Sequence, residues 1–202
     1  MGGKTIALKT IALNTLLVHL GFLPFASCFT LSLLDFIYIS SEGSQLVSKG
    51  LSSFATEIYE LNRSLAYIDK EKGLILLDEF ARGTNPKEGY MLCNALISYL
   101  NPLQVLALIT THYDGVASEA KAHYQCRGLK NVNLVELSER ISHSKESSVD
   151  IIQDYMDFTL EKIYSQRSVP KDALNICRLL GFKEDVLKEV EKYYNKEDFD
   201  EK

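Results

Sequence analysis

The sequence contains no tryptophan, only four prolines and four cysteines, and no long uninterrupted apolar run. The cysteines are scattered without a Cys-x-x-Cys pair and no secretory leader is recognisable, so we expect a reducing, cytoplasmic compartment. The apolar run from Leu16 to Phe29 is interrupted by His19, Gly21 and Pro24, which leaves it too broken to span a bilayer, so no membrane partner is expected. An excess of positive charge is missing too: the net charge of −5 offers no electrostatic footprint for nucleic acid.

What is present fits a globular domain of ordinary size with a small appendage, because the 202 residues are 46% hydrophobic and 24% charged. Helical apolar spacing and short, solid apolar runs alternate along the first 112 residues. The predicted order is helix Lys4–Leu20, one or two strands in Phe29–Ser40, helix Ser52–Asp69, strand Gly73–Phe80, helix Tyr90–Leu100 and strand Leu103–His112. This alternation predicts an α/β fold with a parallel sheet and helices on both of its faces.

The later sequence has a different pattern. Asn131–Glu139 and Val149–Ile163 show polar alternation and are predicted to be strands, of the kind found at an antiparallel edge. Pro170–Gly181 and Lys183–Tyr194 carry two further helical patterns, joined at Gly181.

The first motif is at the start of the sequence, where Gly3, Lys4 and Thr5 match the last three positions of the phosphate-binding loop G-x-x-x-x-G-K-[ST]. In such a loop backbone amides surround the phosphates, the lysine reaches the β and γ oxygens, and the Ser or Thr binds Mg²⁺. The first glycine of the loop is not in the sequence, and three matching residues alone fit chance equally well.

Two acids and a histidine follow successive buried strands. Asp78 and Glu79 end the strand Gly73–Phe80, where one carboxylate can hold Mg²⁺ through water and the other can orient or deprotonate the attacking water. His112 ends the next strand at the same edge of a parallel sheet, where it can hydrogen-bond a γ-phosphate or that water. The alternatives are two solvated acids and a structural histidine, and the combination with Gly3-Lys4-Thr5 favours the functional interpretation.

A serine-rich helix start is the fourth element. Gly50, Ser52 and Ser53 precede a helical pattern, and free amides at a helix N-terminus favour anions. Taken alone, the segment fits a serine N-cap at least as well.

Together these motifs resemble the ATPase domain of the MutS family of mismatch-repair proteins, a relative of the ABC ATPases. MGGKT is similar to the end of that family's GPNMGGKT loop, KGLSSFATEI to GxSTFxxEM, and LILLDEFARGTNPKEG to LVLLDExGRGTSxxDG. TTHY matches the family's THY motif, and VPKDALNICRLLGFKEDVLKEVEKY resembles the segment that follows the family's ATPase core. The resemblance covers nearly the whole chain with five motifs in order.

The resemblance implies a P-loop fold of the ABC or RecA-like type with a mostly parallel central sheet. It implies a truncated ATPase domain in residues 1–165 and a small helical dimerisation segment in residues 166–202. The implied cofactors are ATP and Mg²⁺, and the implied partner is a second copy of the chain. The implied site residues are Met1, Gly2, Gly3, Lys4 and Thr5 for nucleotide, Thr5 and Asp78 for Mg²⁺, Glu79 and His112 for catalysis, and Ser52 acting in trans on the partner's nucleotide.

Three functions stay open at this point. Because the match begins inside the loop, we expect the sequence to be the C-terminal part of a longer protein, whose missing domains would contact mismatched DNA in mismatch repair. The second function is an ATPase acting on a protein client, such as a reactivating factor for a cobalamin-dependent lysine or ornithine aminomutase. The third is an interaction module in which the motifs are relics.

Overall fold

The computed structural model describes residues 3–40, 53–68, 71–164 and 172–200. The chain divides into two compact units, one formed by Gly3–His123 and one that begins at Tyr124. Each unit is described by itself. The boundary that the sequence predicts at residues 165 and 166 lies outside the described residues, and the division made there stays a prediction.

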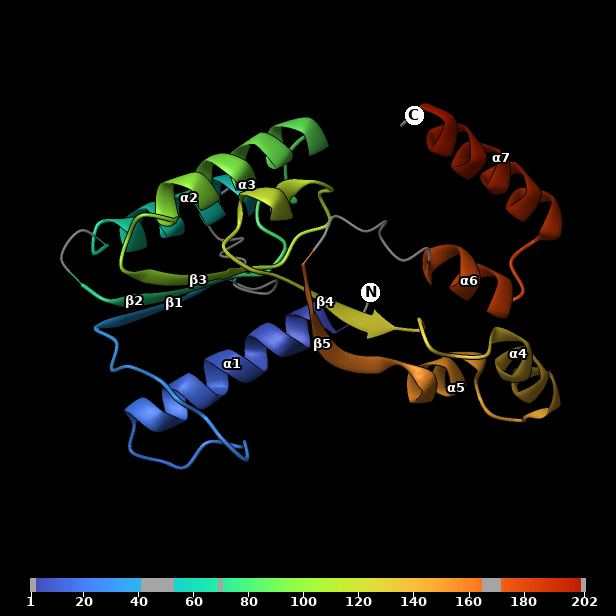
Figure 1. Ribbon diagram of the computed structural model, residues 1–202, viewed down its shortest axis with the longest axis horizontal. Helices are drawn as coiled ribbons and strands as arrows, with labels where there is room; N and C mark the ends of the chain where they lie inside the picture. The colour runs from blue at the N-terminus through green and yellow to red at the C-terminus, as the bar shows by residue number, and fades with distance from the viewer. Residues whose placement is uncertain (1–2, 41–52, 69–70, 165–171, 201–202) are drawn as a thin grey trace. The chain divides into compact units, whose positions relative to one another are not determined.

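A three-stranded parallel sheet forms the centre of the first unit (Figure 1). Its strands are β1 (Phe36–Ser40), β2 (Gly73–Leu77) and β3 (Val105–Ile109), in the order β1-β2-β3. Leu77 of β2 is the register partner of Ser40 on one side and of Ile109 on the other. The segments that follow β2 and β3 therefore leave the sheet at the same edge, which confirms the predicted adjacency of the Asp78 and His112 strand ends.

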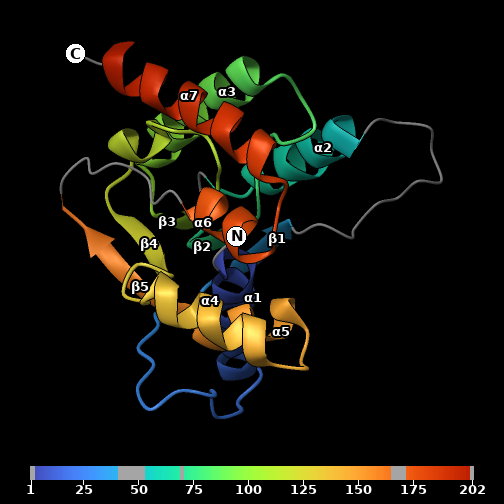
Figure 2. The ribbon, with the colours of Figure 1, turned by 90° about the vertical axis from the view of Figure 1, so that its right-hand side faces the viewer.

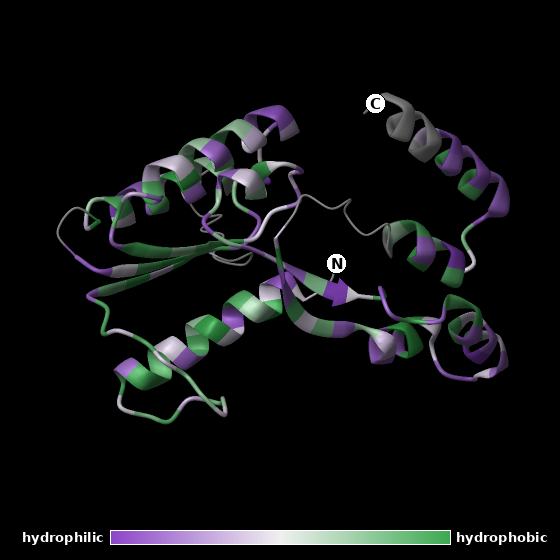
Figure 3. Ribbon diagram, in the orientation of Figure 1, coloured by the Kyte–Doolittle hydropathy of each residue, from purple (hydrophilic) through white to green (hydrophobic). Residues whose placement is uncertain are grey.

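Helices cover both faces of this sheet, as the alternation in the sequence predicts (Figures 1 and 2). They are α1 (Lys4–His19) on one face and α2 (Ser53–Leu65) and α3 (Pro86–Leu100) on the other, with a short 3₁₀ helix, η2 (Val116–Glu119), after β3. Side chains of β2 alternate between the two cores: Leu74 and Leu76 pack with α1, whereas Ile75 and Leu77 pack with α2 and α3. The apolar colour of the strands in Figure 3 reflects this burial on both sides.

Local signals in the sequence explain where these helices begin and end. Gly3 precedes α1 with a φ of 76°, a left-handed conformation that favours glycine. Gly21 closes the same helix with a φ of 82°, and the Phe22 amide donates to the Leu17 carbonyl at 2.8 Å. The Asn85 side chain caps α3 by accepting from the Lys87 amide, and Pro86 occupies the first helical position.

The strand predicted in Phe29–Ser40 is shorter than expected, because only Phe36–Ser40 pairs with the sheet. Pairing begins after Asp35, whose side chain accepts from the Lys72 amide and whose own amide donates to the Lys72 carbonyl. The residues before it are outside the sheet, and Leu33 is 79% exposed.

Two of the sequence predictions for the second unit are wrong. The strand predicted in Asn131–Glu139 is instead the start of helix α4 (Leu134–His143), and Val149–Ile163 contains helix α5 (Ser148–Tyr155) before strand β5 (Asp157–Ile163). The side chains of Asn133 and Ser147 cap the two helices by accepting hydrogen bonds from backbone amides in the first turn. These caps favour a helix over a strand for a polar-apolar pattern that fits both. β5 pairs with β4 (His123–Gly128).

A separate apolar cluster holds this second unit together. Leu129, Leu137 and Ile151 form its buried centre, and Ile176 and Leu179 of α6 (Asp172–Leu179) pack against them. The last helix is α7 (Glu184–Asp200), so both helical patterns predicted near the end of the sequence are present. Among the described residues no helix combines the length and the apolar character that a membrane crossing needs.

Candidate functional site

Asp78 lies at the centre of a hydroxyl cluster just beyond the end of β2. Its side chain is 7% exposed, and its Oδ1 atom accepts hydrogen bonds from Thr5 Oγ1 at 3.0 Å and from Thr110 Oγ1 at 2.7 Å. Thr5 comes from the first turn of α1 and Thr110 from the residue after β3. A buried carboxylate is stable only with such donors, so the two threonines fix Asp78 in place.

Glu79 and His112 form the second contact across this edge. His112 Nε2 lies 2.5 Å from Glu79 Oε1, although the imidazole itself is 54% exposed. Lys4 Nζ donates to the Thr111 carbonyl at 3.1 Å and lies 3.0 Å from His112 Nδ1. The assignment that suits both contacts is a ring whose Nε2–H donates to Glu79 while Nδ1 accepts from the lysine.

The backbone around Glu79 is held in an uncommon conformation. Glu79 and Ala81 have φ values of 53° and 63°, in the left-handed region that residues with a side chain rarely adopt. Such conformations cost about 1–3 kcal/mol each and persist where surrounding contacts determine them. One such contact is the ion pair between Arg82 Nη1 and Glu79 Oε2, at 2.6 Å.

Ala81 is held through both of its backbone polar groups. Its amide donates to Glu57 Oε2 of α2 at 3.3 Å, and its carbonyl accepts from Tyr113 Oη at 2.9 Å. Tyr113 can reach this carbonyl because residue 89 is glycine: a Cβ there would lie 2.1 Å from the tyrosine oxygen. The turn that carries Glu79 is therefore fixed by α2, α3 and the segment after β3 together.

Burial changes the protonation of the groups behind this turn. Desolvation raises the pKa of Glu57, and the hydrogen bond from the Ala81 amide opposes that shift. Burial, followed by the nearby charge of Glu57, raises the pKa of the Cys93 thiol to about 11. The thiol donates to the Phe80 carbonyl at 3.6 Å, so at neutral pH Cys93 is a protonated structural residue rather than a nucleophile.

The donor atoms at this edge fit a magnesium nucleotide. Thr5 and Asp78 present oxygens, the hard ligands that Mg²⁺ prefers, and the 3.0 Å between them is close to the edge of an octahedron with metal–oxygen distances of about 2.1 Å. Among the described residues no three His, Cys, Asp or Glu side chains group into a metal site. Mg²⁺ is commonly held by one or two protein ligands together with waters and substrate phosphates.

The structure brings together Gly3, Lys4, Thr5, Asp78, Glu79 and His112 of the predicted site residues. Met1, Gly2 and Ser52 lie outside the described residues. Thr110, Arg82 and Tyr113 lie inside the motifs quoted from the sequence, but sequence reasoning assigned none of them a role in the site. Strand register is the signal for Thr110, because Leu77 pairs with Ile109 and the next residues are therefore Asp78 and Thr110.

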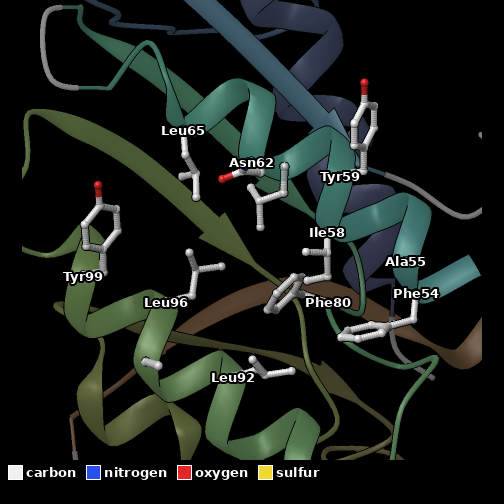
Figure 4. Close-up of a pocket in the computed structure, with 12 residues that line it drawn as sticks. Phe54, Ala55, Ile58, Tyr59, Asn62, Leu65, Phe80, Leu92, Leu96 and Tyr99 are labelled. Carbon is white, nitrogen blue, oxygen red and sulfur yellow. The ribbon is translucent and has the colours of Figure 1, made fainter.

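Two hollows in the described part of this unit differ in size. A cavity of about 60 Å³ next to the acids is lined by Glu79, Phe80, Arg82, Thr111, His112 and Tyr113. A larger groove of about 720 Å³ lies between α2 and α3, where apolar side chains such as Ile58, Leu92 and Leu96 project toward one another (Figure 4). Phe80 lines both hollows, so the residue after Glu79 separates the polar site from the apolar groove.

A lysine and a threonine at the start of a helix, facing two acids at the end of a parallel strand, are typical of P-loop nucleotide-binding domains. The particular family follows from comparison with known proteins. The family model of MutS domain V matches residues 1–196, and the chain belongs to the MutS family, of which domain V is the ATPase domain.

Individual relatives agree with this assignment. The chain is 32% identical over 192 residues, 94% of its length, to Endonuclease MutS2 of Lactococcus lactis subsp. cremoris (strain MG1363), covering 22% of that protein. It is 34% identical over 134 residues, 66% of its length, to Endonuclease MutS2 of Halothermothrix orenii, covering 16% of that protein. It is 32% identical over 136 residues, 66% of its length, to DNA mismatch repair protein MSH3 of Lodderomyces elongisporus, covering 14% of that protein. The chain thus spans less than a quarter of each of these relatives.

Proposed function

We propose that this chain binds ATP with Mg²⁺ and hydrolyses it at the edge formed by the ends of β2 and β3. The observation that carries the proposal is the direct contact between Thr5 Oγ1 and Asp78 Oδ1, 3.0 Å apart. It joins the end of the phosphate-loop motif to the acidic strand end, which are 73 residues apart in the sequence. An interaction module with relic motifs would have no need to preserve this contact.

Each side chain has a role in that reaction. Lys4 would exchange its contact with His112 for the β and γ phosphates, and Thr5 and Asp78 would hold Mg²⁺, which when bound neutralises phosphate charge. Glu79 would accept a proton from the attacking water, and His112, which already contacts Glu79, would orient that water or the γ-phosphate. Arg82 forms an ion pair with the other oxygen of the Glu79 carboxylate, so the negative charge of Glu79 is balanced before nucleotide binds.

The test is nucleotide binding and turnover by the full-length protein. Wild type should bind a fluorescent ATP analogue and release phosphate, and Lys4→Ala should weaken binding by removing the ammonium. Lys9→Ala, a change of the same kind further along α1, is the matched control. Equal nucleotide affinity of the wild type and the Lys4→Ala variant would contradict the proposal.

Assembly is the second part of the proposal. Ser52, at the start of the segment that resembles the family's GxSTFxxEM motif, would complete the nucleotide site of a second copy in a two-fold dimer with two shared sites. Residues 166–202 would supply dimer contacts, and residues 1–165 the ATPase domain. What supports this is the resemblance of both segments to the family pattern.

For the partner that ATP turnover serves, we favour DNA over a protein client. The names of the relatives favour it, because one is a DNA mismatch repair protein and others are endonucleases. With a net charge of −5 the chain itself has no basic excess, so the DNA contacts would come from other parts of the protein. Turnover measured with mismatched duplex, matched duplex and no DNA tests this: stimulation by mismatched duplex supports mismatch repair, whereas no response to either duplex favours a protein client.

A further inference from the structure

The Thr110 side chain contacts both acids of the site. Its hydroxyl donates to Asp78 Oδ1 at 2.7 Å and accepts from the backbone amide of Glu79 at 2.9 Å. A hydroxyl has one proton to donate and lone pairs to accept with, so both contacts can exist at once.

We propose that Thr110 is a positioning residue that sets the orientation of Asp78 and Glu79 together. The proposal rests on the proposed ATPase function and adds a residue to which the sequence motifs assign no role. Thr110 acts through the two acids, and its hydroxyl has no vacant proton with which to serve phosphate or water directly.

The backbone places this hydroxyl accurately. The Thr110 amide donates to the Leu77 carbonyl at 2.9 Å, which extends the ladder between β2 and β3 by one step beyond the paired strands. Asp78 is held on its other side, because its amide donates to the Ser40 carbonyl at 2.9 Å. The acids and the threonine therefore share the rigidity of the sheet, and rigid support is what a preorganised site requires.

The contact to the Glu79 amide has a second effect. Glu79 adopts a φ of 53°, and its amide would lack this acceptor if the backbone rotated out of the left-handed region. The same hydroxyl thus fixes the Asp78 carboxylate directly and the Glu79 side chain through its backbone. Thr5 contacts only the first of these acids among the hydrogen bonds found, so it does not duplicate the role.

The experiment compares Thr110→Val, which keeps the shape and removes the hydroxyl, with Thr110→Ser, which keeps the hydroxyl. Thr159→Val, at a position on β5 in the second unit, is the matched control. For each full-length variant we would measure affinity for a fluorescent ATP analogue with Mg²⁺ and with EDTA, phosphate release, and the melting temperature.

Loss of a supporting partner next to a metal ligand typically costs about 10–100-fold in metal affinity or activity. Mg²⁺ should raise the nucleotide affinity of wild type, and we expect this increase to be about 10–100-fold smaller in Thr110→Val. The kcat of the variant should fall by a similar factor, and its nucleotide affinity in EDTA should equal that of wild type. Thr110→Ser should stay within about 3-fold of wild type in nucleotide affinity and kcat, because a serine hydroxyl makes the same two contacts. Thr159→Val should stay within the same range, because Thr159 lies on β5 in the second unit.

Two results would overturn the positioning role. The first is a Thr110→Val variant whose kcat and whose dependence of nucleotide affinity on Mg²⁺ equal those of wild type. The second is a Thr110→Val variant that loses the same factor of nucleotide affinity with Mg²⁺ and with EDTA, which is the result expected of a merely structural residue. If Thr110→Val melts below the assay temperature, Thr110→Ala removes the same hydroxyl with less bulk and is judged by the same results. A wild type that neither binds nor hydrolyses ATP would instead reject the proposed function, so the two failures are distinguishable.

Discussion

Glu79 has two cationic or hydrogen-donating neighbours and a left-handed backbone, and each feature limits how its carboxylate can move. Arg82 Nη1 is 2.6 Å from one oxygen and His112 Nε2 is 2.5 Å from the other. The side chain is 17% exposed, so water reaches it from a narrow range of directions. Under the proposed function, this carboxylate would accept a proton from a water molecule bound beside it.

The first prediction concerns Glu79 itself. Glu79→Gln keeps the shape and the hydrogen-bonding capacity toward Arg82 but removes the base, so ATP binding should persist while turnover falls by about 10²–10⁴-fold. Glu60→Gln, at a half-buried position of α2 where Glu60 pairs with Arg63 at 3.2 Å, is the matched control. Single-turnover phosphate release and nucleotide binding are measured side by side, and turnover equal to wild type would remove Glu79 from the mechanism.

Gly89 gives the second prediction. In an open helical position alanine would stabilise α3 by up to about 1 kcal/mol relative to glycine. Here the added Cβ would lie 2.1 Å from Tyr113 Oη and 2.5 Å from its Cζ, so the ring must move and release the Ala81 carbonyl. We expect Gly89→Ala to lower the free energy of unfolding by about 1–3 kcal/mol.

Urea unfolding measures this change. A Tyr113→Leu background, in which the contact no longer exists, should reduce the penalty or reverse it, since only the helix preference of alanine then acts. A Gly89→Ala protein more stable than wild type would show that Tyr113 is not held against α3.

At the scale of elements, α2 reaches the site through one carboxylate. Glu57 accepts from the Ala81 amide, and burial raises its pKa above the ordinary 4.5. A raised pKa in the folded state means that the protonated form is favoured by folding. Protonated Glu57 therefore adds to the free energy of unfolding. This stabilisation is complete below the pKa that Glu57 has in the unfolded chain, and it is lost as the pH rises through the pKa in the folded state.

The third prediction follows from that sign. Glu57→Gln keeps an acceptor oxygen for the Ala81 amide and carries no charge, so its stability relative to wild type should increase as the pH rises from about 4 to about 8. Urea unfolding across this range gives the difference between the two proteins at each pH. Glu60→Gln serves as the control on the same helix, and a Glu57→Gln difference that falls with rising pH would contradict the assigned sign.

The elements also show what the sequence can and cannot predict. β2 and β3 were predictable because solid apolar runs of strand length, each followed by polar site residues, have few other solutions in an α/β fold. The prediction of strands at α4 and α5 was wrong because their apolar spacing fits both periods, and the caps at Asn133 and Ser147 decide for helix.

Within the site, the residues to which a motif assigns a chemical role were predicted, whereas the roles of Thr110 and Tyr113 were not, although both lie in the TTHY motif. Lys4, Thr5 and Asp78 stand in short patterns with a known chemistry, so their meeting was expected. Thr110 and Tyr113 gain their roles from pairing with Asp78 and Ala81, which lie 32 residues earlier in the sequence. No local sequence pattern predicts which residue will be the hydrogen-bond partner at that separation. The partner can be identified only once the strand register is known.

At the scale of the whole molecule, the fourth prediction tests the proposed dimer. A Ser52→Arg subunit should spoil only its partner's site, and a Lys4→Ala subunit should lack only its own. The mixed dimer then retains about one working site, because one of its two nucleotides meets both an intact Lys4 and an intact Ser52.

Each variant alone should be nearly inactive, so recovery on mixing is the readout. Phosphate release is measured against the ratio of the two variants, with mixtures of each variant and wild type as reference curves. Deletion of Pro170–Lys202 should leave the protein monomeric and nearly inactive. A monomeric deletion variant that hydrolyses ATP at the full-length rate would exclude a shared site.

The burial of β2 has a consequence for how the first unit opens. Leu74, Ile75, Leu76 and Leu77 are all 0% exposed, and the strand is paired along both edges. Solvent can reach these backbone amides only when the helices leave both faces of the sheet and the neighbouring strands separate. Native-state hydrogen–deuterium exchange should therefore be slowest here, and its denaturant dependence should equal that of global unfolding. Faster exchange in β2 than in the outer turn of α3 would show that the sheet opens before the helices do.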